Sequence, residues 1–316
     1  SQYTGAAVVM NPKTGEILAM VSLPTFNPNS LDADWENLTA NNNGPLVNRA
    51  SAGLYRPGST FKIVTTNALL DSKIDQSYED TGSEVIQNFE ITNFDNQVFG
   101  ALDLRRAFIY SVNTYFASKT NEMGKESLMN MTDKYMFNKP YEFDLEKYDS
   151  AIPYKELNQA DLAMTGFGYG KTQVTPLHMA MITSTIANGG VMMKPRLVST
   201  ITDKDNNVIY ENKKEILSKV TNMTNANTIR DLMVDVVNEG TAKGAYVDGI
   251  QVAGKTGTAD KANGFIDAWF VGFAPAYDPK IAVALVVENS ADTGGVTVAP
   301  IAGNLIRDIF NQVNLD

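Results

Sequence analysis

Short apolar runs near both ends of the chain are bounded by polar turn residues, a pattern that predicts β-strands. At the N-terminus, residues 6–10 and 17–21 flank the sequence Asn-Pro-Lys-Thr-Gly and predict a hairpin. Near the C-terminus, Gly, Pro and Asp separate three more apolar runs, at residues 250–253, 268–273 and 281–287. We therefore expect strands at both ends of the chain.

Between these strands, apolar positions recur at helical spacing. The expected helices cover residues 60–70, 102–124, 125–135, 159–164, 175–187, 225–238 and 299–313. Ser59 precedes the first of these helices and is a plausible N-cap. Residues 23–48 are rich in Asn, Pro and Asp and predict a long ordered loop. Residues 166–170 contain three glycines and predict a bend that lines a cleft.

Strands at both ends with helices between them predict an α/β (α+β) fold with two lobes. The N- and C-terminal strands would form one antiparallel sheet flanked by helices, in a lobe of approximately residues 1–75 and 171–316. Approximately residues 76–170 would form an all-helical second lobe. A chain of 316 residues is long enough for one large domain or two ordinary ones.

Composition excludes several classes of function. The chain has 26 Lys and Arg against 36 Asp and Glu, a formal net charge of −10, so we expect no nucleic-acid partner. It has no cysteine, which excludes disulfides, thiolate zinc sites, iron–sulfur clusters and a cysteine nucleophile. Its one histidine, His178, excludes a multi-histidine metal site, and we expect His178 to be structural. The expected chemistry uses no metal and no cofactor.

The N-terminal sequence Ser-Gln-Tyr-Thr-Gly has no basic segment and no initiator Met, and it runs directly into the first predicted strand. We interpret the chain as a soluble piece of a longer protein. Its longest apolar runs are far shorter than the ~20 residues that a membrane-spanning helix needs.

Lysine is a candidate base for a nucleophile, because cysteine is absent and histidine occurs once. Ser59 and Lys62 form an S-x-x-K motif, and residues i and i+3 of a helix lie on one face. The start of a helix also offers free N–H groups that suit a developing oxyanion. By itself this motif is expected about once by chance in a chain of this length and composition, so it needs further partners.

Two further motifs supply those partners. Ser111 and Asn113 form an S-x-N motif. The sequence Lys-Thr-Gly occurs at Lys13, inside the N-terminal hairpin turn, and at Lys255, between two apolar strand segments. We interpret the first copy as a turn and the second as part of a strand along a sheet edge, where backbone groups can pair with an extended peptide.

The order and spacing of S-x-x-K, S-x-N and K-T-G-T, about 50 and about 140 residues apart, are those of the penicillin-recognising serine enzymes. The chain resembles the transpeptidase domain of a class B, monofunctional penicillin-binding protein over nearly its whole length. The segments that carry this resemblance are residues 5–22, 48–50, 55–62, 111–116, 174–177, 187–190, 254–259 and 269–273. The resemblance implies one transpeptidase domain, residues 1–316, with the penicillin-binding/serine β-lactamase-like fold.

The resemblance also implies catalytic roles. Ser59 would attack the carbonyl of a D-Ala-D-Ala stem peptide and become acylated, and Lys62 would accept its proton. Lys62 must then be a neutral amine, which burial and the neighbouring Lys255 cation both favour. Ser111 would relay a proton to the leaving amine, and Asn113 would orient Lys62 and the substrate amide.

Substrate binding is implied for the K-T-G-T segment, namely Lys255, Thr256, Gly257 and Thr258. The side chains of Lys255, Thr256 and Thr258 would hold the terminal carboxylate of the peptide. The backbone N–H groups of Ser59 and Thr258 would form the oxyanion hole.

The implied partners are peptidoglycan stem peptides, one as D-Ala-D-Ala donor and one as amine acceptor, and β-lactam antibiotics that mimic the donor. The family implies an N-terminal membrane anchor and a pedestal domain outside this sequence. The resemblance also implies that those outside regions contact the membrane and glycosyltransferase, divisome or elongasome partners. The implied location is the extracytoplasmic face of the bacterial cell membrane.

Two alternatives share these motifs. A hydrolase, either a D,D-carboxypeptidase or a β-lactamase, would let water reach the acyl-enzyme, and a non-catalytic β-lactam sensor would keep the acyl group. The segment Glu156-Leu157-Asn158 is similar to the end of the deacylation motif of class A β-lactamases. The position of the required glutamate is occupied by Tyr154, which follows Pro153 and argues against rapid deacylation.

Overall fold

A five-stranded antiparallel sheet joins the two ends of the chain. The computed structural model describes residues 3–261 and 263–313. The strand order is β11-β12-β13-β1-β2. The bounds are Gly5–Met10 for β1, Ile17–Leu23 for β2, Ala253–Asp260 for β11, Ile266–Ala274 for β12 and Ile281–Ser290 for β13. β1 pairs with β13, with Ala6 opposite Val286, so the predicted sheet from both termini is confirmed.

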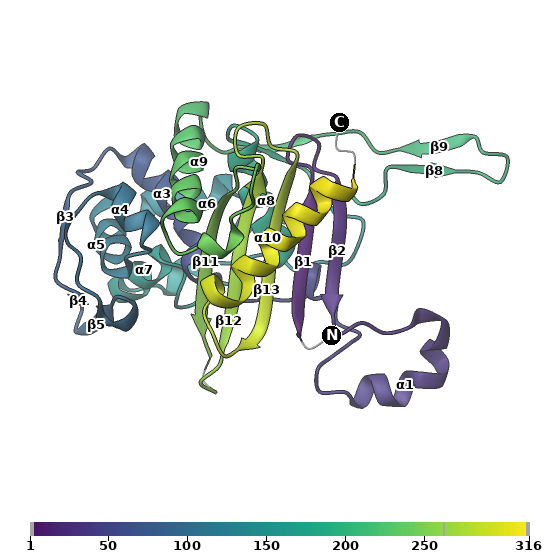
Figure 1. Ribbon diagram of the computed structural model, residues 1–316, viewed down its shortest axis with the longest axis horizontal. Coiled ribbons are helices and arrows are strands. Elements are labelled where there is room, and N and C mark those ends of the chain that lie inside the picture. Colours follow the sequence, from purple (N-terminus) through teal and green to yellow (C-terminus); the bar gives the residue numbers. More distant parts are fainter. Residues whose placement is uncertain (1–2, 262, 314–316) are drawn as a thin grey trace.

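The sheet is covered by helices on both faces. Strands β12 and β13 are buried along almost their whole length, as expected for strands packed on two sides. In Figure 1, α10 (Gly294–Gln312) crosses the front of the sheet and α8 (Pro176–Ala187) lies behind it. α9 (Met223–Asn238) packs beside the edge strand β11. The predicted helices at 175–187, 225–238 and 299–313 are therefore confirmed, although α10 begins five residues earlier than expected.

Beyond β11 lies a group of helices that come from residues 62–166 (Figure 1). Its members are α3 (Lys62–Ser72), α4 (Leu104–Ile109), α5 (Asn113–Met123), α6 (Lys125–Lys134) and α7 (Gln159–Gly166). The expectation of an all-helical region is wrong for residues 78–102. They form two short antiparallel pairs, β3 (Tyr78–Asp80) with β6 (Gly100–Leu102) and β4 (Ser83–Ile86) with β5 (Phe89–Thr92).

The β4–β5 hairpin has a clear local cause. Gln87 and Asn88 are the two residues between the strands, and both have positive φ, of 50° and 64°. Two consecutive left-handed residues are typical of a two-residue hairpin turn. The segment escaped prediction because its strands are short and mostly exposed.

The single helix predicted for residues 102–124 is also wrong. It is divided into α4, which ends at Ile109, and α5, which begins at Asn113. Ser111 lies in the break with a left-handed φ of 59°. Both helices bury apolar residues, so the apolar periodicity continues through the break. The sequence pattern therefore did not reveal the corner at Ser111.

Residues 23–48 contain more structure than the predicted loop. They include α1 (Leu31–Ala40), which projects away from the sheet in Figure 1, and α2 (Arg49–Ala52) follows. α1 has no buried residue, so it lacks the apolar stripe by which helices are recognised in a sequence. A hairpin of β8 (Thr200–Thr202) and β9 (Val208–Glu211) projects on the same side of the molecule.

The remaining strands are β7 (Val191–Met193) and β10 (Ile216–Lys219), which pair with each other. Single 3-10 turns occur at Pro28–Ser30, Gly58–Phe61, Phe94–Asn96, Tyr154–Glu156 and Lys243–Ala245. Within residues 3–261 and 263–313, none of the helices combines the length and apolar character needed to cross a membrane.

Candidate active site

Ser59 lies at the junction between the sheet and the helical group. It belongs to the 3-10 turn Gly58–Phe61, which continues directly into α3 at Lys62. The predicted N-cap role of Ser59 is wrong, because the turn is preceded by Pro57 and α3 by Phe61. In a 3-10 turn residues i and i+3 are eclipsed, so Ser59 and Lys62 share one face, as the S-x-x-K motif predicted.

Lys62 is completely buried beneath this turn. Its Nζ lies within hydrogen-bond distance of Ser111 O at 2.8 Å, Ser111 Oγ at 3.1 Å and Asn113 Oδ1 at 2.8 Å. Burial, followed by the charge of Lys255, holds the pKa of Lys62 well below its ordinary value. The predicted direction of this shift and both of its predicted causes are confirmed, and a lowered pKa is what a lysine base requires.

Ser111 and Asn113 reach Lys62 because of the corner between α4 and α5. The left-handed backbone at Ser111 turns both its carbonyl and its hydroxyl toward Lys62 Nζ. Asn113 is the first residue of α5, and its Nδ2 donates to Thr92 O at 3.2 Å. This contact joins Asn113 to β5, a strand that the sequence pattern did not predict.

Lys255 approaches the same hydroxyl from the sheet. It lies in the edge strand β11, is completely buried, and its Nζ donates to Ser111 Oγ at 3.0 Å and to Thr256 O at 3.2 Å. Burial lowers the pKa of Lys255 to about 7. Ser111 Oγ therefore lies between two lysine amines, and a proton can pass through this hydroxyl between them.

The turn that carries Ser59 packs closely against β11, with backbone in contact with backbone. A Cβ placed on Gly58 would lie 2.4 Å from Thr258 O, and one on Gly257 would lie 2.7 Å from Pro57 O. Only glycine permits such close contact at these two positions. The K-T-G-T segment is therefore on a sheet edge, as predicted, although β11 begins at Ala253 and not at residue 250.

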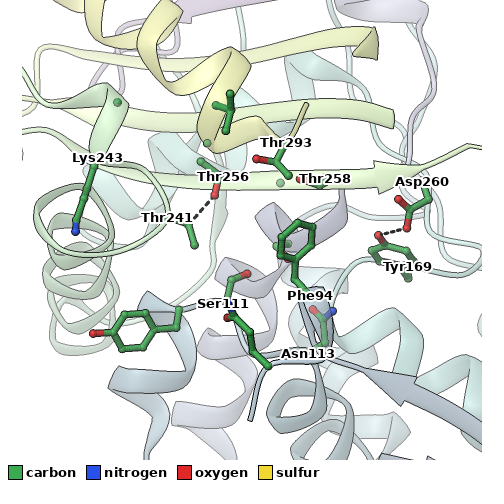
Figure 2. Close-up of a pocket in the computed structure, with 17 residues that line it drawn as sticks. Phe94, Ser111, Asn113, Tyr169, Thr241, Lys243, Thr256, Thr258, Asp260 and Thr293 are labelled. Atoms are coloured by element: carbon green, nitrogen blue, oxygen red, sulfur yellow. Dashed lines mark hydrogen bonds between the residues drawn. The ribbon is translucent and has the colours of Figure 1, made fainter. Parts of the chain in front are cut away.

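These segments border a cleft of about 450 Å³. Six of the eight predicted site residues line it, while Lys62 and Lys255 lie buried below its surface; the six are Ser59, Ser111, Asn113, Thr256, Gly257 and Thr258. Figure 2 shows Ser111 and Asn113 across the cleft from Thr256 and Thr258. All eight predicted residues thus lie in one neighbourhood, and their catalytic roles stay predictions.

The cleft also contains residues that the sequence analysis did not single out. They are Phe94, Gln97, Tyr110, Thr241, Lys243, Gly244, Asp260, Thr293, Gly295 and Val296. Thr241 Oγ1 and Thr256 Oγ1 form a hydrogen bond of 2.7 Å, which fixes the hydroxyl of a predicted binding residue. Most of these residues lie in turns and loops without a chemical motif, and only the fold brings them to the cleft.

The glycine-rich bend at 166–170 lines the cleft as predicted, through Tyr169. Gly58 N donates to Gly168 O at 3.1 Å, and a Cβ on Gly168 would lie 1.9 Å from Gly58 O. The bend therefore supports the turn that carries Ser59.

Two residues that we expected to have no catalytic role lie outside the cleft. Lys13 is in a surface turn, where it forms an ion pair with Asp278, and His178 is buried away from the cleft.

His178 illustrates how a lone histidine can be structural. One of its ring nitrogens, Nε2, lies 2.7 Å from Tyr135 O. Burial lowers its pKa to about 4, so the ring is neutral at physiological pH. It packs against the rings of Phe137 and Tyr141.

Comparison with known proteins agrees with this geometry. Residues 5–307 match the family described as "Penicillin binding protein transpeptidase domain". The chain is 35% identical over 333 residues to Peptidoglycan D,D-transpeptidase PbpA of Mycobacterium tuberculosis, covering 96% of this chain and 66% of that protein. It is 33% identical over 330 residues to Stage V sporulation protein D of Bacillus subtilis, covering 98% of this chain and 49% of that protein.

Solved structures give the same result. The D,D-transpeptidase domain of a peptidoglycan glycosyltransferase from Eggerthella lenta superposes with a TM-score of 0.92 at 37% identity, covering 99% of this chain and 79% of that one. A ceftriaxone acyl-enzyme complex of penicillin-binding protein A from M. tuberculosis has a TM-score of 0.90 at 33% identity, covering 96% of this chain and 74% of that one.

The chain therefore belongs to the penicillin-binding protein transpeptidase domain family, and the resemblance to the class B members is confirmed. It spans just under two thirds of the mycobacterial relative and about half of the sporulation protein.

Proposed function

We propose that this chain is a peptidoglycan D,D-transpeptidase domain that cross-links stem peptides through an acyl-enzyme on Ser59. The observation that carries the proposal is the position of Ser111 Oγ, 3.1 Å from Lys62 Nζ and 3.0 Å from Lys255 Nζ, beside the Ser59 turn. Two buried lysines sharing one hydroxyl, next to a serine on a helix start, make a proton-transfer path that no purely structural role requires.

The first half-reaction acylates Ser59. Ser59 Oγ attacks the carbonyl carbon of the penultimate D-Ala while neutral Lys62 takes the hydroxyl proton. The backbone N–H groups of Ser59 and Thr258 stabilise the oxyanion, in a region where Gly58 and Gly257 let the two segments meet. The C–N bond then breaks, and the proton passes from Lys62 through Ser111 to the departing amine of the terminal D-Ala.

The second half-reaction transfers the acyl group. The amine of a second stem peptide attacks the ester carbonyl, loses a proton along the same path, and releases Ser59 with its hydroxyl restored. During both steps Lys255, Thr256, Gly257 and Thr258 hold the donor along β11, and Asn113 orients the donor amide. A β-lactam would enter in place of the donor, and its ring-opened acyl group would remain on Ser59.

A transpeptidase is favoured over a β-lactamase by the surroundings of residues 153–158. Glu156 is not among the described residues that line the cleft, and Tyr154 is buried with its hydroxyl 2.8 Å from Thr132 Oγ1. Neither residue is available to activate a deacylating water. The sensor alternative differs only in the absence of turnover with peptides.

For the wider protein, we propose one transpeptidase domain over residues 1–316, with an α/β lobe of approximately 1–75 and 171–316 and a second lobe of approximately 76–170, which is mainly helical but includes the short strands β3 to β6. The family supports action on the extracytoplasmic face of the membrane. Peptidoglycan stem peptides and β-lactams are the proposed ligands. A membrane anchor, a pedestal and glycosyltransferase, divisome or elongasome partners would involve regions beyond this chain.

The deciding experiment follows the intact mass of the protein for hours after mixing with benzylpenicillin. We expect one persistent adduct on the wild type and none on Ser59→Ala, which should remain folded by circular dichroism. Lys62→Ala should fold and label far more slowly. Equal labelling of Ser59→Ala would overturn the nucleophile, and a short-lived adduct with loss of free drug would indicate a β-lactamase. Formation of a cross-linked product from stem peptides then separates a transpeptidase from a sensor.

A further inference from the structure

The edge strand β11 presents three side chains to the cleft at alternate positions. Thr256, Thr258 and Asp260 all line it, as the two-residue period of a strand requires. The first two belong to the K-T-G-T motif, whereas Asp260 is the last residue of the strand. Figure 2 shows Asp260 and Tyr169 at one end of the cleft and Lys243 at the other.

Asp260 is exposed but fixed in position. Tyr169 OH donates to Asp260 Oδ2 at 2.7 Å. Burial of Tyr169, together with this hydrogen bond, raises the pKa of the phenol, so Tyr169 remains a donor throughout the physiological range. Arg56 Nη1 contacts the main-chain oxygen of Asp260 at 3.4 Å, and the next residue, Lys261, pairs with Asp267. The ion pairs between described residues therefore leave the Asp260 carboxylate unpaired.

The proposed function sets the direction of a bound donor. Its terminal carboxylate lies near Lys255 and Thr256, and its reacting carbonyl lies at the N–H of Thr258. A peptide held in this way runs antiparallel to β11. The residue before the acyl residue therefore passes Ala259 and approaches Asp260, the point at which the free edge ends.

The charges of the cleft match a donor with opposite charges along its length. Lys243, which lines the cleft, and the buried Lys255 lie toward the carboxylate end. Asp260 is the one acidic residue among the described residues that line the cleft, and Arg56, a cation at the same end, contacts its main-chain oxygen and not its carboxylate. A flexible side chain that ends in an ammonium group can reach a carboxylate one or two residues farther along the strand.

We infer that Asp260, held by Tyr169, is a specificity-determining residue that favours donors whose residue before the acyl residue carries an ammonium-ended side chain. This inference rests on the proposed function and deepens it, because it assigns the chemistry of one donor position. The pair would form at a solvent-exposed site, so the expected preference is about two- to fivefold in acylation rate.

The test uses penicillins that differ only at the end of the acyl side chain. One carries 6-aminohexanoyl, the second the isosteric heptanoyl group, and the third adipoyl, which ends in a carboxylate. The second-order rate constant of acylation is measured for each by intact mass. We expect the ammonium probe to be fastest and the carboxylate probe slowest on the wild type, with a smaller spread in about 1 M NaCl.

Three variants separate charge recognition from structural effects. In Asp260→Asn the ratio of the ammonium to the heptanoyl rate should fall to about one, and in Asp260→Lys the carboxylate probe should become the fastest. Tyr169→Phe should give an intermediate ratio, because the carboxylate loses its anchor. The matched control is Asp205→Asn, which removes the same charge in the loop between β8 and β9 and should keep the wild-type ratio.

The outcomes are distinct for the two proposals. If all three penicillins acylate Ser59 at equal rates on the wild type, or if Asp260→Asn keeps the wild-type ratio, the inference is overturned and the proposed function stands. If none of the three acylates the wild type, the proposed function fails and the inference fails with it. A reversed preference in Asp260→Lys, with the ratio preserved in Asp205→Asn, supports the inference.

Discussion

Lys255 Nζ donates a hydrogen bond to Ser111 Oγ over 3.0 Å, although the two residues are 144 positions apart in the sequence. This contact joins the edge of the sheet to the corner between two helices. Because Lys62 Nζ lies 3.1 Å from the same oxygen, the charge of Lys255 adds to burial in lowering the pKa of Lys62. We therefore expect the two lysines to titrate as a coupled pair.

The first prediction concerns the pH dependence of acylation. Lys62 must be neutral to accept a proton, so the rate should rise with pH as its amine deprotonates. The Lys255 cation is the second cause that lowers the pKa of Lys62, after burial. Lys255→Met removes that charge, raises the pKa of Lys62, and should move the rising limb of the rate–pH profile upward by about one pH unit.

The measurement is the penicillin acylation rate over a range of about pH 5 to 10. Lys243→Met is the control, because it removes an exposed cation of the cleft that has no contact with Lys62. Its rate–pH midpoint should match that of the wild type. A downward or absent shift in Lys255→Met would show that Lys62 is not the titrating base.

The second prediction separates the backbone and the hydroxyl of Ser111. Both Ser111→Gly and Ser111→Ala remove the oxygen that lies between the lysines and should slow acylation strongly, by about 100-fold or more. The left-handed φ of 59° suits glycine but strains alanine. Ser111→Gly should therefore be more stable than Ser111→Ala by about 1 kcal/mol in urea unfolding. Equal acylation rates in wild type and Ser111→Gly would remove the relay role.

The third prediction tests the close approach of the Ser59 turn to β11. Gly58 has a φ of +53°, and a Cβ there would lie 2.4 Å from Thr258 O. Gly249 has a φ of +74° and open space around its missing Cβ. Alanine at either position should cost about 1–2 kcal/mol of stability through backbone strain. Only Gly58→Ala should also lose acylation, because it pushes Thr258 away from Ser59.

Acylation by benzylpenicillin and the midpoint of thermal unfolding are measured for both variants. If Gly249→Ala lost acylation to the same extent, the effect would reflect general strain. If Gly58→Ala kept the wild-type rate, the Ser59 and Thr258 segments would not need this distance to react.

The fourth prediction concerns Asp80, a buried carboxylate outside the cleft. It accepts hydrogen bonds from Gly82 N, Asn93 Nδ2, Phe99 N and Thr114 Oγ1. These bonds hold the loop that carries Phe94 against the start of α5. Asp80→Asn places an NH₂ group among donors and should cost about 2–4 kcal/mol of unfolding free energy.

The same variant should slow acylation, because Asn113 precedes Thr114 in α5 and loses its fixed neighbour. Asp95→Asn is the matched control, since Asp95 is exposed in the same loop and its left-handed conformation, with φ of 51°, is well tolerated by Asn. Urea unfolding and penicillin acylation of both variants provide the measurements. Similar stability of the two variants would contradict the anchoring role of Asp80.

Much of the site could be predicted because its chemistry lies in short motifs. Ser59 and Lys62 are one turn apart, and Ser111 and Asn113 flank a single residue, so local geometry already places each pair. Asp260 and Thr241 belong to no motif of this kind. They could not be found, because they come from a strand end and a loop that meet only at the cleft.

The errors in the predicted elements share one cause. Periodicity reports burial of a face, so it finds α8 and the central strands, which are buried almost throughout. It misses α1, which buries nothing, and the short strands β4 and β5, which are mostly exposed. The periodicity also continues through Ser111, because the left-handed backbone at Ser111 makes the corner without any change in the apolar pattern.

By itself the sequence determined the family and the sheet built from both chain ends, and it singled out eight residues that the fold brings into one neighbourhood, because these follow from local spacing and order. The tertiary structure alone decided that Ser111 Oγ lies between two buried lysines and that Asp260 faces the cleft. The physical reason is that pKa values and charge recognition depend on distance and burial, which arise only when segments far apart in the chain pack together.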